Sequence, residues 1–128
     1  MKILILDDMQ MRHDVFANFF AGHDVTHTFK FSDFVKALEQ NSPFDIIHLD
    51  HDLADFFDQP DFLIDNHGRK KEYNGQHAAL KVTQLPEELL PLNVIIHSVN
   101  PLGAQAMLEI IQNKGIPVVC EPFKAENY

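Results

Sequence analysis

Apolar residues along the chain fall into short continuous runs and into longer stretches with a helical period. Residues 3–6 form an apolar run without alternation, which is typical of a strand that is buried on both faces. Residues 44–49 and 94–97 are similarly apolar, residues 25–29 alternate, and residues 118–120 form a last short run. The pattern therefore predicts five strands.

The stretch that follows the first strand has the period of an amphipathic helix over residues 10–20. Its predicted apolar face consists of Met11, Val15, Phe16, Phe19 and Phe20. Ser32 is a favourable N-cap residue, so we predict that it starts a second helix.

Helical spacing returns in the second half of the chain, after a long polar segment at about 54–74. A third helix is predicted over residues 76–84. Asn100 and Pro101 predict the start of a fourth, since asparagine is favoured at the N-cap and proline at the first helical position. Gly115 predicts its end.

Strands that alternate with helices predict an α/β fold, a parallel sheet with right-handed crossovers and helices on both faces. We expect residues 1–128 to form a single domain, interrupted by the polar insert at about 54–74. In such sheets ligands bind beyond the carboxyl ends of the strands. We therefore expect the functional side chains to lie where each predicted strand ends.

Acidic residues follow the first and third predicted strands. Asp7 and Asp8 end the first strand, and Asp50 and Asp52 follow the third. One aspartate of the first pair can cap a helix, which leaves the other unexplained. Carboxylates crowded at one edge repel one another unless they share a cation, so we predict a Mg²⁺ or Mn²⁺ site.

The motif HLDHDL at 48–53 places two aspartates and two histidines close together, which makes it the most informative segment of the chain. Asp50 and Asp52 are two residues apart, so their side chains should leave the strand on one side. We interpret His48 as a hydrogen-bonded core histidine. His51 is either structural or functional, as a proton donor or a softer metal ligand, because imidazole titrates near neutral pH.

The fourth strand ends in a second polar group. His97 is a candidate general acid or metal ligand, with a buried structural histidine as the alternative. Ser98 can donate a hydrogen bond to a phosphoryl oxygen. Asn100 is foremost a helix cap, and the N–H groups of Leu102 and Gly103 would then face a bound phosphate.

Composition narrows the classes of function. A net charge of −9 argues against a groove for long nucleic acids but allows a small phosphate ester bound through a metal ion. A single cysteine excludes an intrachain disulfide. The first apolar run is four residues long and is followed by Asp7 and Asp8, so it predicts neither a signal peptide nor a membrane span, and we expect a cytoplasmic protein.

With these motifs the chain resembles the receiver domain of two-component response regulators, nearly from end to end. Asp7 and Asp8 match the acidic pair of that family, and Asp50 matches its phospho-accepting aspartate. Asp52 matches a metal-binding backbone position, and Ser98 matches the hydroxyl residue that ends the fourth strand. The resemblance implies a flavodoxin-like sheet with the strand order 2-1-3-4-5.

The chain also departs from ordinary receivers. Glu121 stands where receivers have a lysine before a proline, and the insert at about 54–74 is foreign to them. His51, His97 and Asn100 are further additions. Residues 49–53 and 97–104 look more like the cyclic-phosphate-processing receiver-like domains, which implies metal-dependent phosphoesterase chemistry.

The leading hypothesis is therefore a hydrolase that acts on a cyclic phosphate or another small phosphodiester. Its predicted metal ligands are Asp7, Asp8, Asp50 and Asp52; its catalytic residues His51, His97 and Asp50; its substrate-binding residues Ser98, Asn100 and Gly103. One alternative is a signalling receiver that is phosphorylated on Asp50, which Glu121 weighs against. Another is a pseudo-receiver that binds a partner or nucleotide without turnover, and a nuclease with a DxD strand end is a weaker fourth.

Overall fold

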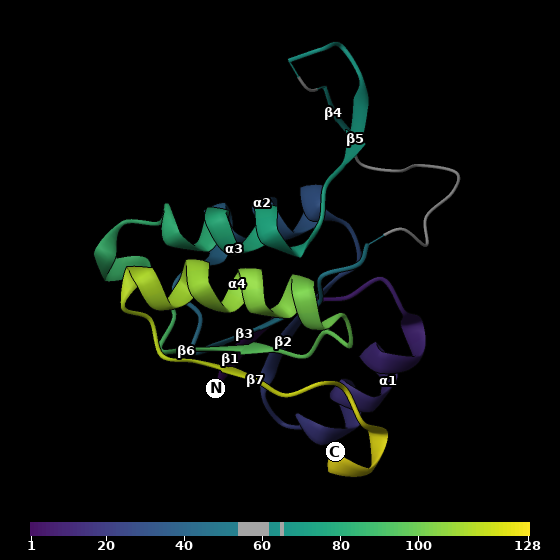
Figure 1. The fold of residues 1–128 in the computed structure, drawn as a ribbon. Coiled ribbons are helices and arrows are strands. Elements are labelled where there is room, and N and C mark those ends of the chain that lie inside the picture. Colours follow the sequence, from purple (N-terminus) through teal and green to yellow (C-terminus); the bar gives the residue numbers. More distant parts are fainter. Residues whose placement is uncertain (54–61, 65) are drawn as a thin grey trace.

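A five-stranded parallel sheet forms the centre of the computed structural model, which describes residues 1–53, 62–64 and 66–128. Its strands run in the order β2-β1-β3-β6-β7, which confirms the predicted order 2-1-3-4-5 (Figure 1). The bounds are β1 (Lys2–Leu6), β2 (Asp24–Thr28), β3 (Ile46–Leu49), β6 (Asn93–Ile96) and β7 (Val118–Cys120).

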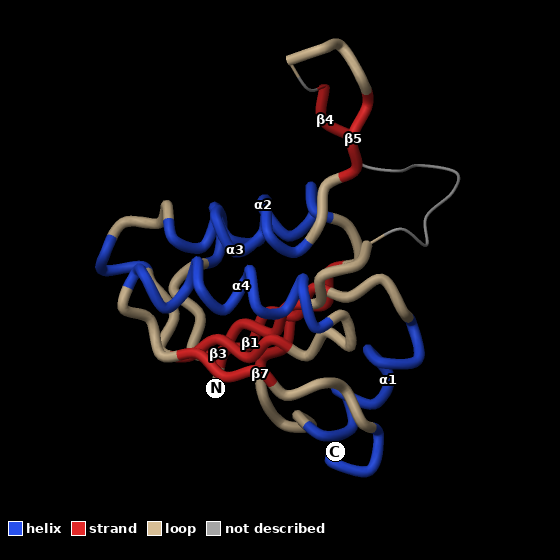
Figure 2. The backbone as a smooth tube through the Cα atoms, in the orientation of Figure 1, coloured by secondary structure: helices blue, strands red, loops and turns tan. Residues whose placement is uncertain are grey.

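Helices cover both faces of this sheet, as predicted (Figure 2). Three of them, α2, α3 and α4, lie together on one face, whereas α1 and the C-terminal residues lie on the other (Figure 1). The bounds are α1 (Gln10–Phe19), α2 (Phe31–Asn41), α3 (Gly75–Thr83) and α4 (Pro101–Lys114), with 3₁₀ turns at η1 (Glu87–Leu89) and η2 (Ala125–Asn127).

Strand alternation divides the core into two layers. In β1, Leu4 and Leu6 face the large apolar cluster under α2, α3 and α4, whereas Ile3 and Ile5 face a smaller one under α1. All four side chains are fully buried, so β1 is the strand buried on both faces that the continuous apolar run predicted.

The smaller core layer is built around an aromatic cluster on α1. The Phe16 ring is fully buried, and its centroid lies 5.5 Å from that of Phe123 and 5.0 Å from that of Tyr128. Two residues of the predicted apolar face, Met11 and Phe19, are instead 51% and 53% exposed. The buried stripe of α1 is therefore rotated about the helix axis relative to the predicted apolar face. A single helix covers this face of the sheet, so only a narrow line of its side chains contacts the sheet.

Helix ends confirm one cap prediction and correct another. Asn100 caps α4, and its side chain accepts a hydrogen bond from the N–H of Gly103. Gly115 ends that helix with φ 87°, a left-handed conformation that favours glycine. The predicted Ser32 cap is wrong: the N-cap of α2 is Lys30, two residues earlier, and the first helical residue is Phe31, whose side chain is buried in the core.

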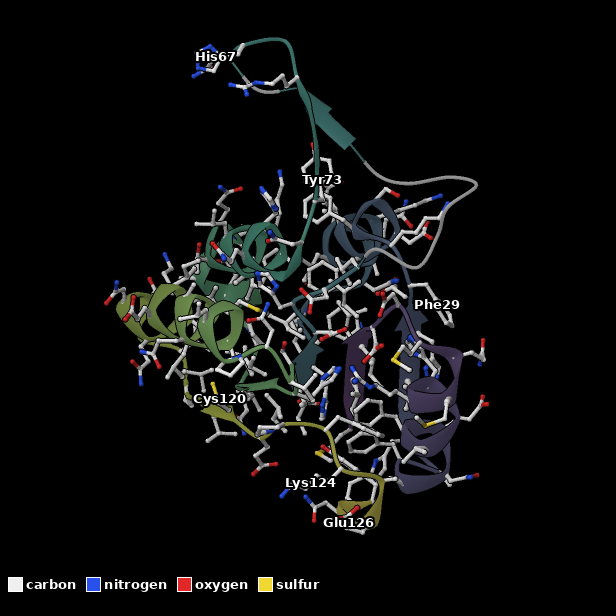
Figure 3. The ribbon with its side chains drawn as sticks, turned by 45° about the vertical axis from the view of Figure 1, so that its right-hand side comes forward. Phe29, His67, Tyr73, Cys120, Lys124 and Glu126 are labelled. Carbon is white, nitrogen blue, oxygen red and sulfur yellow. The ribbon has the colours of Figure 1, made fainter. Side chains whose placement is uncertain are left out.

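The polar insert contains a two-stranded antiparallel sheet that the sequence did not predict. Its strands β4 (Phe62–Ile64) and β5 (Lys70–Glu72) project from the body of the molecule (Figure 1), with His67 at the far end (Figure 3). Residues 54–61 and 65 of the predicted insert lie outside the described residues. At the base, the Tyr73 ring stacks on Phe31 at 4.1 Å.

No helix in the described part of the chain is both long and apolar enough to cross a bilayer.

The difference in burial between two neighbouring phenylalanines is directly testable. We expect Phe16→Ala to lower the free energy of unfolding by about 3–5 kcal/mol, because it removes a fully buried ring. Phe19→Ala, on the same helix and 53% exposed, should cost about 1 kcal/mol or less. Urea denaturation measures both variants, and equal losses would contradict the rotated packing of α1.

Candidate functional site at the carboxyl ends of the strands

The alignment of three neighbouring strands brings the candidate residues together. β1, β3 and β6 end in register, and the next residues are Asp7, Asp50 and His97. The N–H of Asp50 donates to the carbonyl of Leu6 at 3.0 Å, and the N–H of His97 donates to that of Leu49 at 3.0 Å. These bonds extend the ladder by one residue, so the three residues are adjacent.

Asp7, Asp50 and His97 form a buried group on the α1 side of the sheet. Each offers one ligand atom, and these atoms lie within 4.8 Å of one another. Their exposed fractions are 0%, 3% and 0%. The group follows Ile5 and His48 by two residues, so strand alternation directs its side chains toward the same layer.

Asp7 is the best-satisfied carboxylate of this group. Its Oδ2 accepts a hydrogen bond from Nε2 of His97 at 2.6 Å, and its Oδ1 accepts one from the N–H of Met9 at 2.8 Å. Burial alone would raise the pKa of Asp7, but these bonds and the charge of Arg12 hold it below its ordinary value. Asp7 is therefore ionised at neutral pH.

Asp50 is in the opposite situation. Burial, and then the charge of Asp7, raise its pKa to about 8, with a smaller contribution from Asp8; the charge of Arg12 and the N–H of His51 only partly oppose this rise. The two neighbouring carboxylates therefore share a site that lacks enough positive charge to ionise both.

The donor set fits a divalent cation. Two carboxylate oxygens and one imidazole nitrogen converge from three strands, and a dication would offset the burial and the repulsion that together keep Asp50 protonated. Burial lowers the pKa of His97, so its ring is neutral, as a ligand requires. Asp7, Asp50 and His97 are the residues that could hold the ion.

His48 is buried, as predicted, but its ring nitrogens lack the hydrogen bond that was predicted. Its ring lies 4.8 Å from that of Phe16 and 5.5 Å from that of Phe20. Neither ring nitrogen has a hydrogen-bond partner among the described residues, so the predicted hydrogen-bonded histidine is wrong. Burial lowers the pKa of His48 to about 3, which keeps the ring neutral.

Arg12 was not predicted, although it contacts both carboxylates. Its Nη1 lies 3.3 Å from Oδ2 of Asp7 and 3.6 Å from Oδ2 of Asp50. The signal for it lies in the helical period, since Arg12 precedes buried Phe16 by four residues and therefore shares its face.

His13 is a second unpredicted contributor from the same helix. It is 2% exposed, and its Nε2 donates to the backbone carbonyl of Asp7 at 2.8 Å. Its Nδ1 lies 2.7 Å from Nδ1 of His27 in β2. His13 therefore fixes the backbone at the end of β1 without joining the ligand group.

A second group lies around His51, between the starts of α3 and α4. Nδ1 of His51 donates to Oδ1 of Asp52 at 2.8 Å, and its Nε2 accepts from Nε2 of Gln76 at 3.3 Å. Nδ2 of Asn100 donates to the same Asp52 oxygen at 3.4 Å. Asp52 thus orients the imidazole, with Nε2 on the side of the ring that faces Gln76.

Two glycines allow His51 to approach the helices. A Cβ on Gly103 would overlap Cγ of His51, and one on Gly75 would overlap the carbonyl oxygen of Asp50. The N–H of Gly103 is already bound by Asn100, so a phosphate could use it only after this cap opens. The predicted substrate-binding roles of Asn100 and Gly103 stay predictions.

The remaining predicted site residues lie around these two groups. Ser98 is 2% exposed, and its Oγ accepts from the N–H of Asn100 at 3.1 Å, so its hydroxyl hydrogen remains available. Asp8 is half-buried and acts on Asp50 through its charge. The side chain of Asp52 is 61% exposed and faces His51, since β3 ends before it; its predicted metal role stays a prediction.

The sequence model of the cyclic-phosphate processing receiver domain matches residues 2–113. No curated protein matches the chain significantly.

Solved structures of response regulators share the fold. NtrX from Brucella abortus is 17% identical with a TM-score of 0.61, over 98% of this chain but only 24% of its own. A response regulator from Burkholderia pseudomallei, solved with a phosphorylated aspartic acid, calcium ion and citrate, is 14% identical with a TM-score of 0.61, over 98% of this chain and 62% of its own.

The raised pKa of Asp50 predicts a pH-dependent stability. The folded protein keeps this proton up to about pH 8, whereas the unfolded chain loses it near the ordinary value of 3.8, so stability falls as pH rises between them. An amide at this position cannot ionise. We therefore expect Asp50→Asn, in EDTA, to gain roughly 3 kcal/mol over the wild type between about pH 5.5 and 8.5.

Urea unfolding at both pH values measures this gain. Asp24→Asn, which changes an exposed carboxylate, is the matched control and should follow the wild type. A difference between Asp50→Asn and the wild type that is the same at both pH values would contradict the shifted carboxyl group.

The contact between Gly103 and His51 predicts that a helix-favouring substitution is harmful. Alanine is normally better than glycine in a helix by about 1 kcal/mol, but here its Cβ would displace the His51 ring. We expect Gly103→Ala to destabilise the protein by roughly 1–3 kcal/mol. Gln105→Ala, on the exposed side of α4, should be neutral in the same denaturation assay, and a stabilised Gly103→Ala would refute the contact.

Proposed function

The chain belongs to the family of cyclic-phosphate processing receiver domains, and on this premise we propose that it is a metal-dependent phosphoesterase. Its substrate would be a cyclic phosphate or a similar small phosphodiester. The observation that carries the proposal is the pairing of a buried ligand group with an oriented histidine at the same sheet edge. Asp50 and His51 are consecutive, so the two groups meet at the end of β3.

The metal side of the site would be Asp7, Asp50 and His97. A divalent cation bound there supplies Lewis-acid polarisation of a phosphoryl oxygen and activation of an attacking water. Carboxylate oxygens with one imidazole suit Mn²⁺ or Mg²⁺, with the nitrogen favouring Mn²⁺. Asp8 would strengthen the field on the ion without being buried in the group.

The proton donor would be His51 and not His97. His97 is fully buried and its Nε2 faces Asp7, so it has no path to a leaving group. The side chain of His51 is 12% exposed, and Asp52 holds its Nδ1–H, which leaves Nε2 as the atom that exchanges a proton with the substrate. Asp52 would thus act through His51.

The reaction needs only water as its second reactant. The water oxygen would form a bond to phosphorus and release a proton to the solvent, while one phosphorus–oxygen ester bond breaks. Protonated His51 would give its Nε2 proton to the leaving oxygen and would take a proton back from the solvent, so that the net reaction consumes one water. A cyclic phosphate would open to a phosphomonoester with a free hydroxyl. The hydroxyl of Ser98 and the start of α4 would hold the remaining phosphoryl oxygens.

A second candidate function is a receiver that accepts a phosphoryl group on Asp50. The position of Asp50 at the end of β3, beside Ser98 at the end of β6, favours it. Burial and the raised pKa of Asp50 weigh against it in the metal-free protein, since a protonated carboxyl is a poor nucleophile.

One experiment separates the two functions. The protein is incubated with Mn²⁺ and a panel of cyclic mononucleotides, 2′,3′-cyclic phosphate termini and cyclic oligonucleotides, and products are followed by chromatography. We expect hydrolysis of at least one class, lost in EDTA. Absence of all turnover, with phosphorylation of Asp50 by acetyl phosphate, would replace the phosphoesterase proposal with the receiver function.

Variants assign the roles within an active enzyme. We expect His51→Ala to lower kcat by roughly 10²–10⁴-fold, the usual contribution of a general acid. Asp52→Asn should lower kcat less and shift the pH profile, because the imidazole loses its carboxylate partner. His23→Ala, an exposed histidine on a loop, is the control, and full activity of His51→Ala would rule out this proton donor.

A further inference from the structure

Arg12 is a cation placed against the ligand group, and the proposed chemistry leaves it without a role. Its side chain is 12% exposed, so it is largely withdrawn from water. The guanidinium lies over the Phe123 ring, with 5.1 Å between its central carbon and the ring centroid. Helix α1 and the segment after β7 therefore hold it at the edge of the site.

The contacts of Arg12 with the carboxylates are loose. Both use the single nitrogen Nη1, at 3.3 Å from Asp7 and 3.6 Å from Asp50. A strong charge-assisted bond is about 2.7–2.9 Å long and an arginine–carboxylate pair is often bidentate. Nε of Arg12 is buried and has no partner among the described residues. Most of the hydrogen-bonding capacity of the planar guanidinium group is thus unused.

A divalent cation and Arg12 cannot both neutralise the same oxygens. Oδ2 of Asp7 is shared by His97 and Arg12, and Oδ2 of Asp50 also faces Arg12. An ion on these oxygens would repel the guanidinium while leaving it anchored on Phe123. A guanidinium group displaced in this way could hydrogen-bond a tetrahedral oxyanion held by the same ion, since guanidinium geometry matches that of phosphate.

We propose that Arg12 is the oxyanion-binding residue of this site: it holds Asp7 and Asp50 in the metal-free protein and turns to a phosphate group when a divalent cation binds there. The ligand class is a phosphate or phosphate ester. This inference rests on the proposed metal site but not on turnover.

The test measures binding directly, with Mn²⁺ and inorganic phosphate as probes. Calorimetry first gives the Mn²⁺ affinity of the wild type, Arg12→Gln and Arg12→Lys, and then the phosphate affinity of each Mn²⁺-loaded protein. We expect Arg12→Gln to bind Mn²⁺ as tightly as the wild type or a few-fold tighter, because a competing cation is gone. Phosphate should bind it about 10- to 100-fold more weakly, the usual effect of losing a charged hydrogen bond.

Two variants control for charge and for folding. Lys114→Gln, at the exposed end of α4, removes the same charge far from the site and should leave both affinities unchanged. Arg12→Lys keeps the charge and most of the packing but lacks the planar guanidinium group, so it should weaken phosphate several-fold with Mn²⁺ binding intact. It keeps the test decisive if Arg12→Gln fails to fold.

Each outcome decides between a ligand-binding and a structural Arg12. Unchanged phosphate affinity in the folded variants, with only a lower Tm, would mean that Arg12 serves packing on Phe123, and the inference would fail. A Mn²⁺-loaded wild type that binds no phosphate would also overturn it. Phosphate binding that depends on Arg12, without hydrolysis of any substrate, would contradict the phosphoesterase proposal alone.

Discussion

The common register of β1, β3 and β6 is the constraint on which the site depends. Each strand contributes its first residue beyond the ladder, and backbone bonds at 3.0 Å hold Asp50 and His97 level with their neighbours. A slip of one residue in β3 would move Asp50 to the other side of the sheet and bring His51 toward α1. The buried apolar residues Ile47 and Leu49 prevent that slip, because it would reverse the layers that they face. The packing of the core and the assembly of the site therefore require the same strand register.

The site carries more negative charge than its surroundings can neutralise, and the metal-free structure accommodates this in three ways. His97 donates a hydrogen bond to Asp7, Asp50 keeps its proton, and Arg12 approaches both carboxylates at distances too long for strong pairing. A divalent cation would relieve all three at once. The same position that makes Asp50 costly to ionise therefore makes the edge receptive to a metal ion and, through that ion, to an anionic ligand.

Much of the fold and part of the site could be predicted from local patterns. Four apolar runs and one alternating stretch identified the five strands of the main sheet, and Asn100 and Gly115 marked the ends of α4 because capping depends on neighbouring residues alone. The parallel sheet then brought Asp7, Asp50 and His97 to one edge, as strand ends must. Arg12 and His13 were missed because a helix contributes to a site through one face, and the exposed Met11 and Phe19 show that this face was assigned with the wrong rotation.

Local patterns in the chain were enough to establish which strands form and which carboxylates reach the carboxyl edge, and the resemblance to receivers supplied the strand order. Strand periodicity and capping are local properties, which is why they can be read without a structure. Tertiary packing decided which site residues join the buried ligand group and which join the group around His51. Asp50 and Asp52 separate because β3 ends at Leu49 and strand alternation does not continue beyond it. Packing also placed His51 between two glycines and set Arg12 against the acidic pair. These contacts join segments far apart in the chain, and their geometry depends on how helices pack on the finished sheet.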